Sequence, residues 1–378
     1  MSGNESLTTT EIKKQNCKKV FDYLYQNQRT SKQTIAQALG LSMPTVSQNL
    51  KLLEGAGVVR RDGFYESTGG RKAHVLRFVQ DARVAVGVAI LEGSVQLCAV
   101  DLLGEVLREE THPLPYENSD GYYQQVGRLV RGLMAHLPYG KERVLGVGIA
   151  IQGLVSADGE RVVYGAILNN NGVTREMFQR YIPYPCRLLH DTEVGAAAEF
   201  WHNQEIRDAI YLVLNRNMGG ALVVDGKVQQ GSGIIEHMTL FPGGEPCYCG
   251  KKGCVEAYCS ANSLRRATGF PVELFFQRLR AGDGQCRQVW DTYLKNLALA
   301  MDNMRMLVDC KFVIGGYLQQ FLTGEDLERL TEYAHRQTAF PELPICLTQS
   351  RYGPNAAVLG AAIYYIDQLL QNIEPLLE

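Results

Sequence analysis

The chain has 378 residues, of which 46% are hydrophobic, and a formal net charge of −2 at pH 7. A globular protein of this length has two or three domains that can each bury a core. No run of about 18 apolar residues is present, which excludes a transmembrane helix, and the polar N-terminus lacks the apolar stretch of a signal peptide. We therefore expect a cytoplasmic protein without membrane insertion, whose cysteines stay reduced.

The charge is unevenly distributed along the chain. Residues 1–80 carry 12 lysines and arginines against 6 aspartates and glutamates, whereas the rest of the chain carries 26 against 34. A basic segment on an acidic body favours contact with a polyanion such as nucleic acid. A chance distribution of surface charge is the alternative.

Three helices are predicted in the basic segment. Apolar residues recur at helical spacing over residues 11–28. Ser31 is placed to cap a second helix that ends at Gly40, and Ser42 is placed to cap a third helix with Pro44 in its first turn. We expect the third helix to bury four apolar side chains, those of Val46, Leu50, Leu52 and Leu53.

Two short helices, a glycine-containing turn and an outer face of small polar side chains are typical of a DNA-binding helix-turn-helix. Amide and hydroxyl side chains suit base edges, because glutamine pairs with adenine and serine or threonine adapts to several partners. Two strands of a wing follow, and its tip at 69–72 can reach phosphate or the minor groove. A helical hairpin used only for packing is the alternative. The expected DNA-binding residues are Thr45, Ser47, Gln48, Lys51, Arg71 and Lys72.

From Val84 onward, strands alternate with helices. An apolar alternation on both sides of residues 92–94 predicts a hairpin. This pattern over the C-terminal ~295 residues predicts an α/β body of two lobes. Further strands are expected at 143–155, 209–215, 221–232 and 311–316, and helices at 190–202 and 288–308.

A dense cysteine cluster lies in the second half of the chain, where residues 247–259 hold four of the ten cysteines. Three of them form a C-x-C-x4-C motif, and Gly250 and Gly253 allow the backbone to fold sharply enough to bring three sulfurs together. Three thiolates and one imidazole complete a closed tetrahedral zinc site, whereas iron–sulfur clusters normally take four cysteines. Cys259 is the rival fourth ligand, and buried free cysteines or a disulfide are the alternatives. The expected zinc ligands are His237, Cys247, Cys249 and Cys254.

These motifs together resemble the ROK proteins, a family of repressors and sugar kinases with an actin-like, RNase-H-like fold. The most specific element is the His…C-x-C-G-x-x-G-C-x-E signature, which runs here from His237 to Glu256. The winged helix-turn-helix before such a body is similar to the NagC/XylR-type repressors, and this resemblance covers nearly the whole chain. It implies three domains: a winged helix-turn-helix at 1–80, a first lobe at 81–190, and a second lobe with the zinc loop at 191–378, whose C-terminal helix can pack back on the first lobe.

Two departures from the family pattern count against catalysis. ROK kinases carry a D-x-G-x-T-like phosphate loop on the first hairpin, but Ala89 replaces its aspartate here and Glu92 occupies the turn. An ATP phosphate with Mg²⁺ needs backbone amides and a metal-binding carboxylate at such a loop. The second loop, at 215–220, has lost two of three glycines. Asp191 matches the family's catalytic base, yet we expect no enzymatic activity, with a residual sugar kinase as an alternative.

The family's sugar pocket is only partly kept. His190 replaces an asparagine, and Ile234 replaces the first carboxylate of a Glu-x-x-His motif. Because polar sites discriminate strongly against ligands that leave groups unpaired, the usual glucose- or N-acetylglucosamine-type ligand is expected to bind weakly, or another ligand is recognised. A vestigial pocket is the alternative. The resemblance implies that His237 binds zinc with one nitrogen and faces the sugar with the other. The expected effector-binding residues are His190, Asp191, His237 and Glu256.

The sequence thus predicts a transcriptional regulator, and more specifically a repressor of carbohydrate-metabolism genes that carries structural zinc and senses a sugar or sugar phosphate. A single small DNA-binding module binds modestly, and two modules gain by reading two half-sites. We therefore expect a homodimer or homotetramer on a double-stranded operator. Control by a protein partner instead of a sugar is the alternative.

Overall fold

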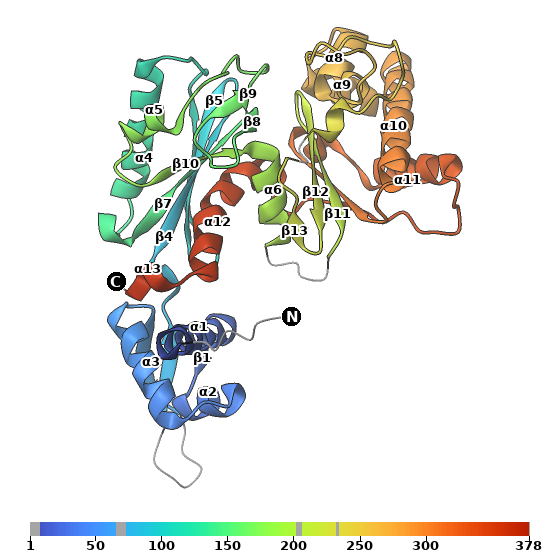
Figure 1. Cartoon of the computed structure of the whole chain (residues 1–378). Helices are drawn as coiled ribbons and strands as arrows, with labels where there is room; N and C mark the ends of the chain where they lie inside the picture. The colour runs from blue at the N-terminus through green and yellow to red at the C-terminus, as the bar shows by residue number, and fades with distance from the viewer. Residues whose placement is uncertain (1–7, 66–72, 202–205, 232–233, 378) are drawn as a thin grey trace, which may run out of the picture.

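The computed structural model describes residues 8–65, 73–201, 206–231 and 234–377. Figure 1 shows a small N-terminal head below a body of two lobes that stand side by side. The predicted α/β body of two lobes is confirmed. Among the described helices, none combines the length and the apolar character needed to cross a bilayer.

The head contains three helices and a three-stranded antiparallel sheet with the strand order β1-β3-β2. The strands β2 and β3 form the predicted wing, and β1 adds a third strand to it. The elements of the head are α1 (Thr9–Asn27), β1 (Arg29–Thr30), α2 (Lys32–Leu39), α3 (Met43–Gly55), β2 (Val59–Phe64) and β3 (His74–Phe78).

The helix boundaries of the head follow from local side-chain chemistry. The Ser31 hydroxyl accepts a hydrogen bond from the Thr34 backbone N–H at 3.1 Å, and Ser42 does the same for Thr45 at 3.2 Å. Gly40 has a φ of 62°, the left-handed conformation that ends α2. Both predicted N-caps and the predicted helix stop are therefore confirmed.

One predicted core residue of α3 is wrong. Val46, Leu50 and Leu53 are buried as expected, but the side chain of Leu52 is 48% exposed. The buried residues Val46, Asn49, Leu50 and Leu53 form one stripe along α3. At about 100° per residue, Leu52 lies roughly 110° away from the centre of this stripe and therefore outside it.

The first lobe is built on a five-stranded sheet with the order β10-β7-β4-β5-β6. The hairpin expected around residues 92–94 is confirmed, and β7 and β10 add in parallel beside β4. The helices α4 and α5 cover one face, and α12 covers the other. The elements are β4 (Val84–Ile90), β5 (Ser94–Asp101), β6 (Val106–Pro113), α4 (Asp120–Ala135), β7 (Val144–Ile151), β8 (Leu154–Val155), β9 (Val162–Tyr164), α5 (Arg175–Gln179), β10 (Cys186–His190) and α12 (Ala356–Gln371).

The alternation of side chains along β4 explains which helix packs on which face. Its valines and Ile90 pack with the α4 and α5 side, whereas its alanines join the α12 side. A Cβ added at Gly87 would lie 1.9 Å from the Val358 carbonyl oxygen, and one at Gly148 would lie 2.0 Å from that of Ala361. The small residues therefore let the backbone of α12 lie directly on the sheet.

The second lobe repeats this topology. Its sheet has the order β13-β12-β11-β14-β15, in which β11 pairs antiparallel with β12 and parallel with β14, as β4 does with β5 and β7. This duplication is typical of the actin-like fold that the resemblance implied. The elements are α6 (Asp191–Phe200), β11 (Ala209–Leu214), β12 (Met218–Val224), β13 (Lys227–Val228), α7 (Glu256–Cys259), α8 (Ala261–Thr268), α9 (Val272–Arg280), α10 (Gly284–Arg305), β14 (Lys311–Gly315), α11 (Gly324–Gln337) and β15 (Leu347–Gln349).

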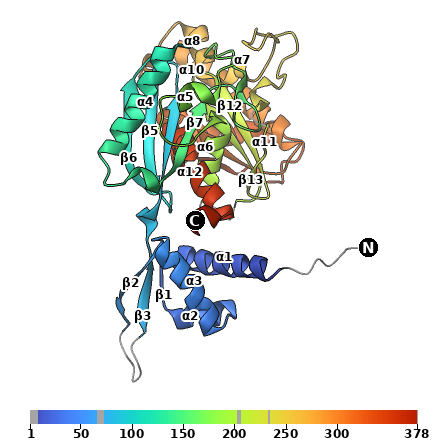
Figure 2. The ribbon, with the colours of Figure 1, turned by 60° about the vertical axis from the view of Figure 1, so that its left-hand side comes forward.

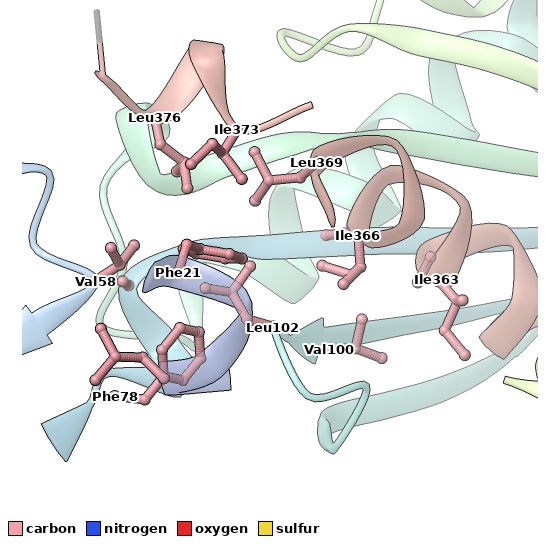
Figure 3. Packing of buried hydrophobic residues seen from close by; sticks show 14 of the residues in the cluster. Phe21, Val58, Phe78, Val100, Leu102, Ile363, Ile366, Leu369, Ile373 and Leu376 are labelled. Atoms are coloured by element: carbon pink, nitrogen blue, oxygen red, sulfur yellow. The ribbon is translucent and has the colours of Figure 1, made fainter. Parts of the chain in front are cut away.

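The head and the first lobe share one hydrophobic core. Figure 3 shows head side chains packing against the turn after β5 and against the C-terminal helices α12 and α13 (Glu374–Leu377). Figure 2 shows the C-terminus close above α1. The backbone N–H of Leu102 also donates a hydrogen bond to the Gln80 carbonyl at 2.8 Å. The labelled residues of this joint are Phe21, Val58, Phe78, Val100, Leu102, Ile363, Ile366, Leu369, Ile373 and Leu376.

Candidate functional site

The outer surface of α3 carries the residues expected to contact DNA. Gln48 and Lys51 are exposed, and Thr45 and Ser47 are half-buried. The Ser47 hydroxyl donates a hydrogen bond to the Met43 carbonyl at 2.7 Å, and that of Thr45 lies 2.8 Å from the Ser42 hydroxyl. The amide of Gln48 and the ammonium of Lys51 are thus the groups of α3 best placed to reach outward. Arg71 and Lys72, at the expected wing tip, lie outside the described residues.

The predicted metal ligands come together in space. The imidazole of His237 and the thiols of Cys247, Cys249 and Cys254 offer one ligand atom each, and these atoms all lie within 4.8 Å of one another. The Sγ atoms of Cys249 and Cys254 are 3.7 Å apart, and Nδ1 of His237 is 3.5 Å from Sγ of Cys247. Zinc–sulfur bonds of about 2.3 Å at tetrahedral angles would hold two sulfurs roughly 3.8 Å apart. The cluster can therefore hold a tetrahedral metal ion.

Two glycines shape the loop that carries these thiols. Gly250 and Gly253 have φ values of 89° and 81°, a backbone conformation that other residues rarely adopt. A Cβ at Gly253 would also lie 1.7 Å from the Phe241 carbonyl oxygen. The rival ligand Cys259 is fully buried in the apolar core of the second lobe and does not belong to the cluster. All ten cysteines are free thiols.

A cavity lies between the two lobes, beside the metal cluster. The cavity is open to solvent, and its empty space, the open mouth included, is about 640 Å³. The first lobe contributes Gln152 and Tyr164, and the second contributes Asn215, Asn217 and Tyr248. The predicted effector-binding residues His190, Asp191 and His237 also line it.

His190 and Asp191 stand at the end of β10 and the start of α6. The Asp191 carboxylate accepts a hydrogen bond from the Thr192 backbone N–H at 2.9 Å and lies 3.6 Å from Nε2 of His190. Burial raises the pKa of Asp191. Burial alone would lower the pKa of His190, but the carboxylates of Glu193 and Asp191 raise it above its usual value. The pair therefore presents one acidic and one basic group to the cavity.

His237 faces the metal cluster and the cavity with different nitrogens. Its Nδ1 lies toward the Cys247 thiol, and its Nε2 lies 3.6 Å from a carboxylate oxygen of Glu236. Glu236 lines the cavity and is only 6% exposed, and burial raises its pKa to about 8. The sequence interpretation missed Glu236. The signal in the sequence was a glutamate directly before His237. It lies two positions after Ile234, where the family has a glutamate and this chain has none.

Glu256 lies behind the cavity wall. Its side chain is buried and accepts a hydrogen bond from the backbone N–H of Met218, which does line the cavity. Burial raises the pKa of Glu256 to about 7. The carboxylate thus supports the β12 backbone, and direct contact between Glu256 and a ligand stays a prediction.

The two loops that resemble phosphate loops face each other across the lobes. Nη1 of Arg216, in the turn before β12, lies 2.7 Å from a carboxylate oxygen of Glu92, in the turn after β4. Cβ atoms added at Gly219 and Gly220 would lie 2.6 Å from the Thr192 hydroxyl and 2.2 Å from the Ile235 side chain. A larger residue at either position would therefore make the Thr192 or Ile235 side chain shift.

Comparison with known proteins decides the family. Residues 85–368, which are most of the chain, match the model of the ROK family. The chain belongs to the ROK family. Residues 18–60 also match a winged helix-turn-helix DNA-binding model, so a DNA-binding head precedes a ROK body.

Proteins similar to this chain include both repressors and kinases. The xylose repressor of Caldicellulosiruptor bescii is 22% identical over 396 residues, which cover 97% of this chain and 98% of that protein. The N-acetylmannosamine kinase of Haemophilus influenzae is 25% identical over 286 residues, covering 72% of this chain and 92% of the kinase. A solved ROK family transcriptional regulator, described as a homolog of the E. coli MLC protein, covers 97% of this chain and 99% of its own with a TM-score of 0.78 and 20% identity. The head-and-body fold is therefore shared with a ROK regulator.

Proposed function

We propose that the protein is a transcriptional repressor of carbohydrate-metabolism genes whose affinity for DNA is set by a sugar in the cavity between the lobes. The observation that carries this proposal is the shared core, which joins a winged helix-turn-helix to a body whose cavity is lined by both polar and apolar side chains. The full-length similarity to a xylose repressor supports it. A repressor shares a compartment with its operator, and we place the protein in the cytoplasm.

In this proposal α3 enters the major groove of a double-stranded operator. Gln48 reads base edges, Thr45 and Ser47 assist, and Lys51 contacts phosphate. Arg71 and Lys72 on the wing contact phosphate or the minor groove. Because one such module contacts few base pairs, the protein binds as a homodimer or homotetramer with heads spaced by one or more helical turns of DNA.

A chain of packed helices connects the cavity to α3. Asp191 lines the cavity at the start of α6, and α6 packs on α12 so closely that a Cβ at Gly360 would lie 1.8 Å from the Val194 carbonyl oxygen. The helix α13, directly after α12, packs against α3. A ligand that binds more tightly to one position of α6 would therefore shift the population of head positions.

We assign zinc to the cluster of three thiolates and one imidazole, a ligand set that zinc favours. His237 would bind the ion through Nδ1 and keep its proton on Nε2, the nitrogen that lies toward Glu236. Zinc would then have a structural role that also fixes one wall of the cavity.

The degraded phosphate loops argue against phosphoryl transfer. Ala89 is buried in β4 and offers no carboxylate for a metal ion. Glu92 and Arg216, in the two loops that resemble phosphate loops, form an ion pair with each other. We therefore propose that the protein is not an enzyme. If the protein were a residual sugar kinase, a coupled assay with a panel of sugars would detect ADP formation. If the effector were a protein, that protein would dissociate the repressor from DNA and no sugar would.

The proposal is tested with DNA that the full-length, zinc-loaded protein selects from a random library. Operator affinity is then measured against D-xylose, D-glucose, D-glucosamine and their phosphates, in parallel with thermal unfolding. A ligand at 100 times its Kd adds about 2.7 kcal/mol of apparent stability, and the same ligand should weaken DNA binding. If the protein enriches no DNA sequence from the random library, the proposal that it binds a specific operator is wrong. Stable DNA binding that no sugar alters would contradict the sugar-sensing part.

A further inference from the structure

A second pocket lies in the head, where β1 leads into α2. Figure 1 shows α2 in the part of the head that is away from the two lobes, so this pocket is separate from the cavity between them. Its wall includes no carboxylate among the described residues, and Arg29 is their one charged side chain. The residues that β1 and the start of α2 contribute are Arg29, Thr30, Ser31 and Thr34.

The start of α2 supplies hydrogen-bond donors to this pocket. The backbone N–H groups of Lys32 and Gln33, the first two of the helix, have no acceptor within the described part of the chain. Helical N–H groups point toward the start of the helix, where they and the helix dipole favour an anion. The hydroxyls of Ser31 and Thr34 lie 2.7 Å apart. Because only one of them can donate to the other, the second hydroxyl keeps a proton that it can donate to a ligand.

Thr30 gives an independent indication of a ligand. It lines the pocket and is only 4% exposed, and its Oγ1 atom has no hydrogen-bond partner among the described residues. Buried hydroxyls without a partner are unfavourable and rare in folded proteins. A hydrogen-bond acceptor bound in the pocket would give this hydroxyl its partner.

Arg29 belongs to a row of three arginines across the sheet of the head. It pairs in register with Arg77 of β3, which pairs in turn with Arg60 of β2, and all three are exposed. Residues directly opposite each other on antiparallel strands point to the same face, and like charges in such pairs are unfavourable. Asp62 lies 3.6 Å from Arg77 and offsets one of these charges, whereas Arg29 has no ion-pair partner among the described residues. An anion beside Arg29 would therefore reduce the repulsion.

The end of α1 also borders the pocket, and the free carbonyl groups of a helix end would repel an anion. Several of these carbonyls already have donors. The side-chain amide of Asn27 donates to the Tyr23 carbonyl at 2.8 Å. The backbone N–H of Gln28 donates to the Leu24 carbonyl at 2.8 Å, and its side-chain amide donates to the Tyr25 carbonyl. The donors at the start of α2 thus face little opposition from α1.

We infer that Arg29, Thr30 and the start of α2 form a second ligand site, in the head, that binds a phosphate group. Phosphate oxygens accept several hydrogen bonds and carry the negative charge that this set of donors favours. The phosphate group can come from a free phosphate or phosphorylated metabolite, or from the backbone of DNA bound to the head. The site includes neither the cavity between the lobes nor the cysteine cluster, so the inference goes beyond the proposed function.

Calorimetric titration of the full-length, zinc-loaded protein with inorganic phosphate, at an ionic strength held constant with chloride, tests the free source. Arg29→Gln and Thr30→Val should each weaken phosphate binding by about tenfold or more, because each removes a donor to a charged group. Without phosphate, Thr30→Val should unfold at the wild-type temperature or above it, since it removes a buried hydroxyl that has no partner. Arg61→Gln is the matched control, because Arg61 is exposed in β2, lies 3.1 Å from Glu54 and does not line the pocket.

Fluorescence anisotropy with random DNA at several salt concentrations tests the DNA source. Both pocket variants should then weaken DNA binding more than Arg61→Gln does, and Arg29→Gln should reduce the salt dependence by about one counterion. Loss of phosphate binding alone assigns the site to a free phosphate, and loss of DNA binding alone assigns it to the DNA backbone.

Melting temperature and zinc content establish that each variant is folded. Unchanged affinity for both phosphate and DNA in the folded Arg29 and Thr30 variants would overturn the inference, as would equal losses in Arg61→Gln. The phosphate titration uses neither DNA nor sugar, so its result is separate from the operator test of the proposed function.

Discussion

Within the cysteine cluster, three sulfurs and one nitrogen approach one another to distances that a tetrahedral ion would set. We predict that Cys249→Ser loses most of its zinc and unfolds at a lower temperature, because metal binding contributes free energy to folding. Metal analysis and thermal unfolding measure both effects. Cys346→Ser is the control, since Cys346 is exposed and outside the cluster. Wild-type zinc content in Cys249→Ser would refute the metal site.

Gln48 and Lys51, two exposed residues of α3, should affect DNA binding differently. Gln48→Ala should cost about 1–3 kcal/mol on the selected DNA and leave random DNA unaffected, because it removes a base contact. Lys51→Ala should weaken binding to both DNAs and reduce the salt dependence by about one counterion, because it removes a phosphate contact. Fluorescence anisotropy at several salt concentrations separates the two. Equal losses on both DNAs for both variants would mean that α3 is not the recognition helix.

At the scale of single elements, the close contact between α6 and α12 predicts a sensitive position. Gly360→Ala places a methyl group against the Val194 carbonyl oxygen, so the helices must separate, at a cost of about 1–3 kcal/mol in stability. Gly132→Ala is the matched control in α4, where an added Cβ meets nothing within 4 Å and better helix propensity should leave stability unchanged or raise it by up to about 1 kcal/mol. Urea unfolding compares them. Equal stability of Gly360→Ala and wild type would show that α6 and α12 do not depend on this contact.

The elements that the sequence predicted well are those fixed by neighbouring residues. The caps at Ser31 and Ser42 depend on an N–H three residues away, and the metal ligands lie close together along the chain. The failures concern the direction of single side chains. Leu52 was assigned to the core although Leu53 already occupies that face of α3. Glu236 was missed because its direction toward the cavity depends on the short 3-10 helix at Ile235–His237, which the sequence pattern does not predict.

Contacts between segments far apart along the chain could not be predicted from the sequence either. The resemblance implied that the C-terminal helix can pack on the first lobe, but not that its end lies in the core of the head. Phe21 and Leu369 stand at opposite ends of the chain and belong to one cluster. No local periodicity records such a contact, because each helix shows only that one face is apolar.

At the scale of the whole molecule, the shared core makes the head depend on the body. Leu369→Ala removes a buried side chain from the joint, which costs about 2–5 kcal/mol, and should speed amide hydrogen exchange throughout α1. Leu133→Ala, the same change on the opposite face of the sheet, should leave α1 protected. Unaltered exchange of α1 in Leu369→Ala would show that the head folds independently.

If the cavity and the DNA-binding surface are two linked sites of one protein, reciprocal binding measurements detect the link. The Kd of selected DNA is determined with and without a saturating sugar, and the Kd of that sugar with and without saturating DNA. We predict that each ligand weakens the binding of the other by the same factor, typically about 5- to 150-fold. A sugar that binds in the cavity with the same affinity in free and DNA-bound protein would show that the two sites are not linked.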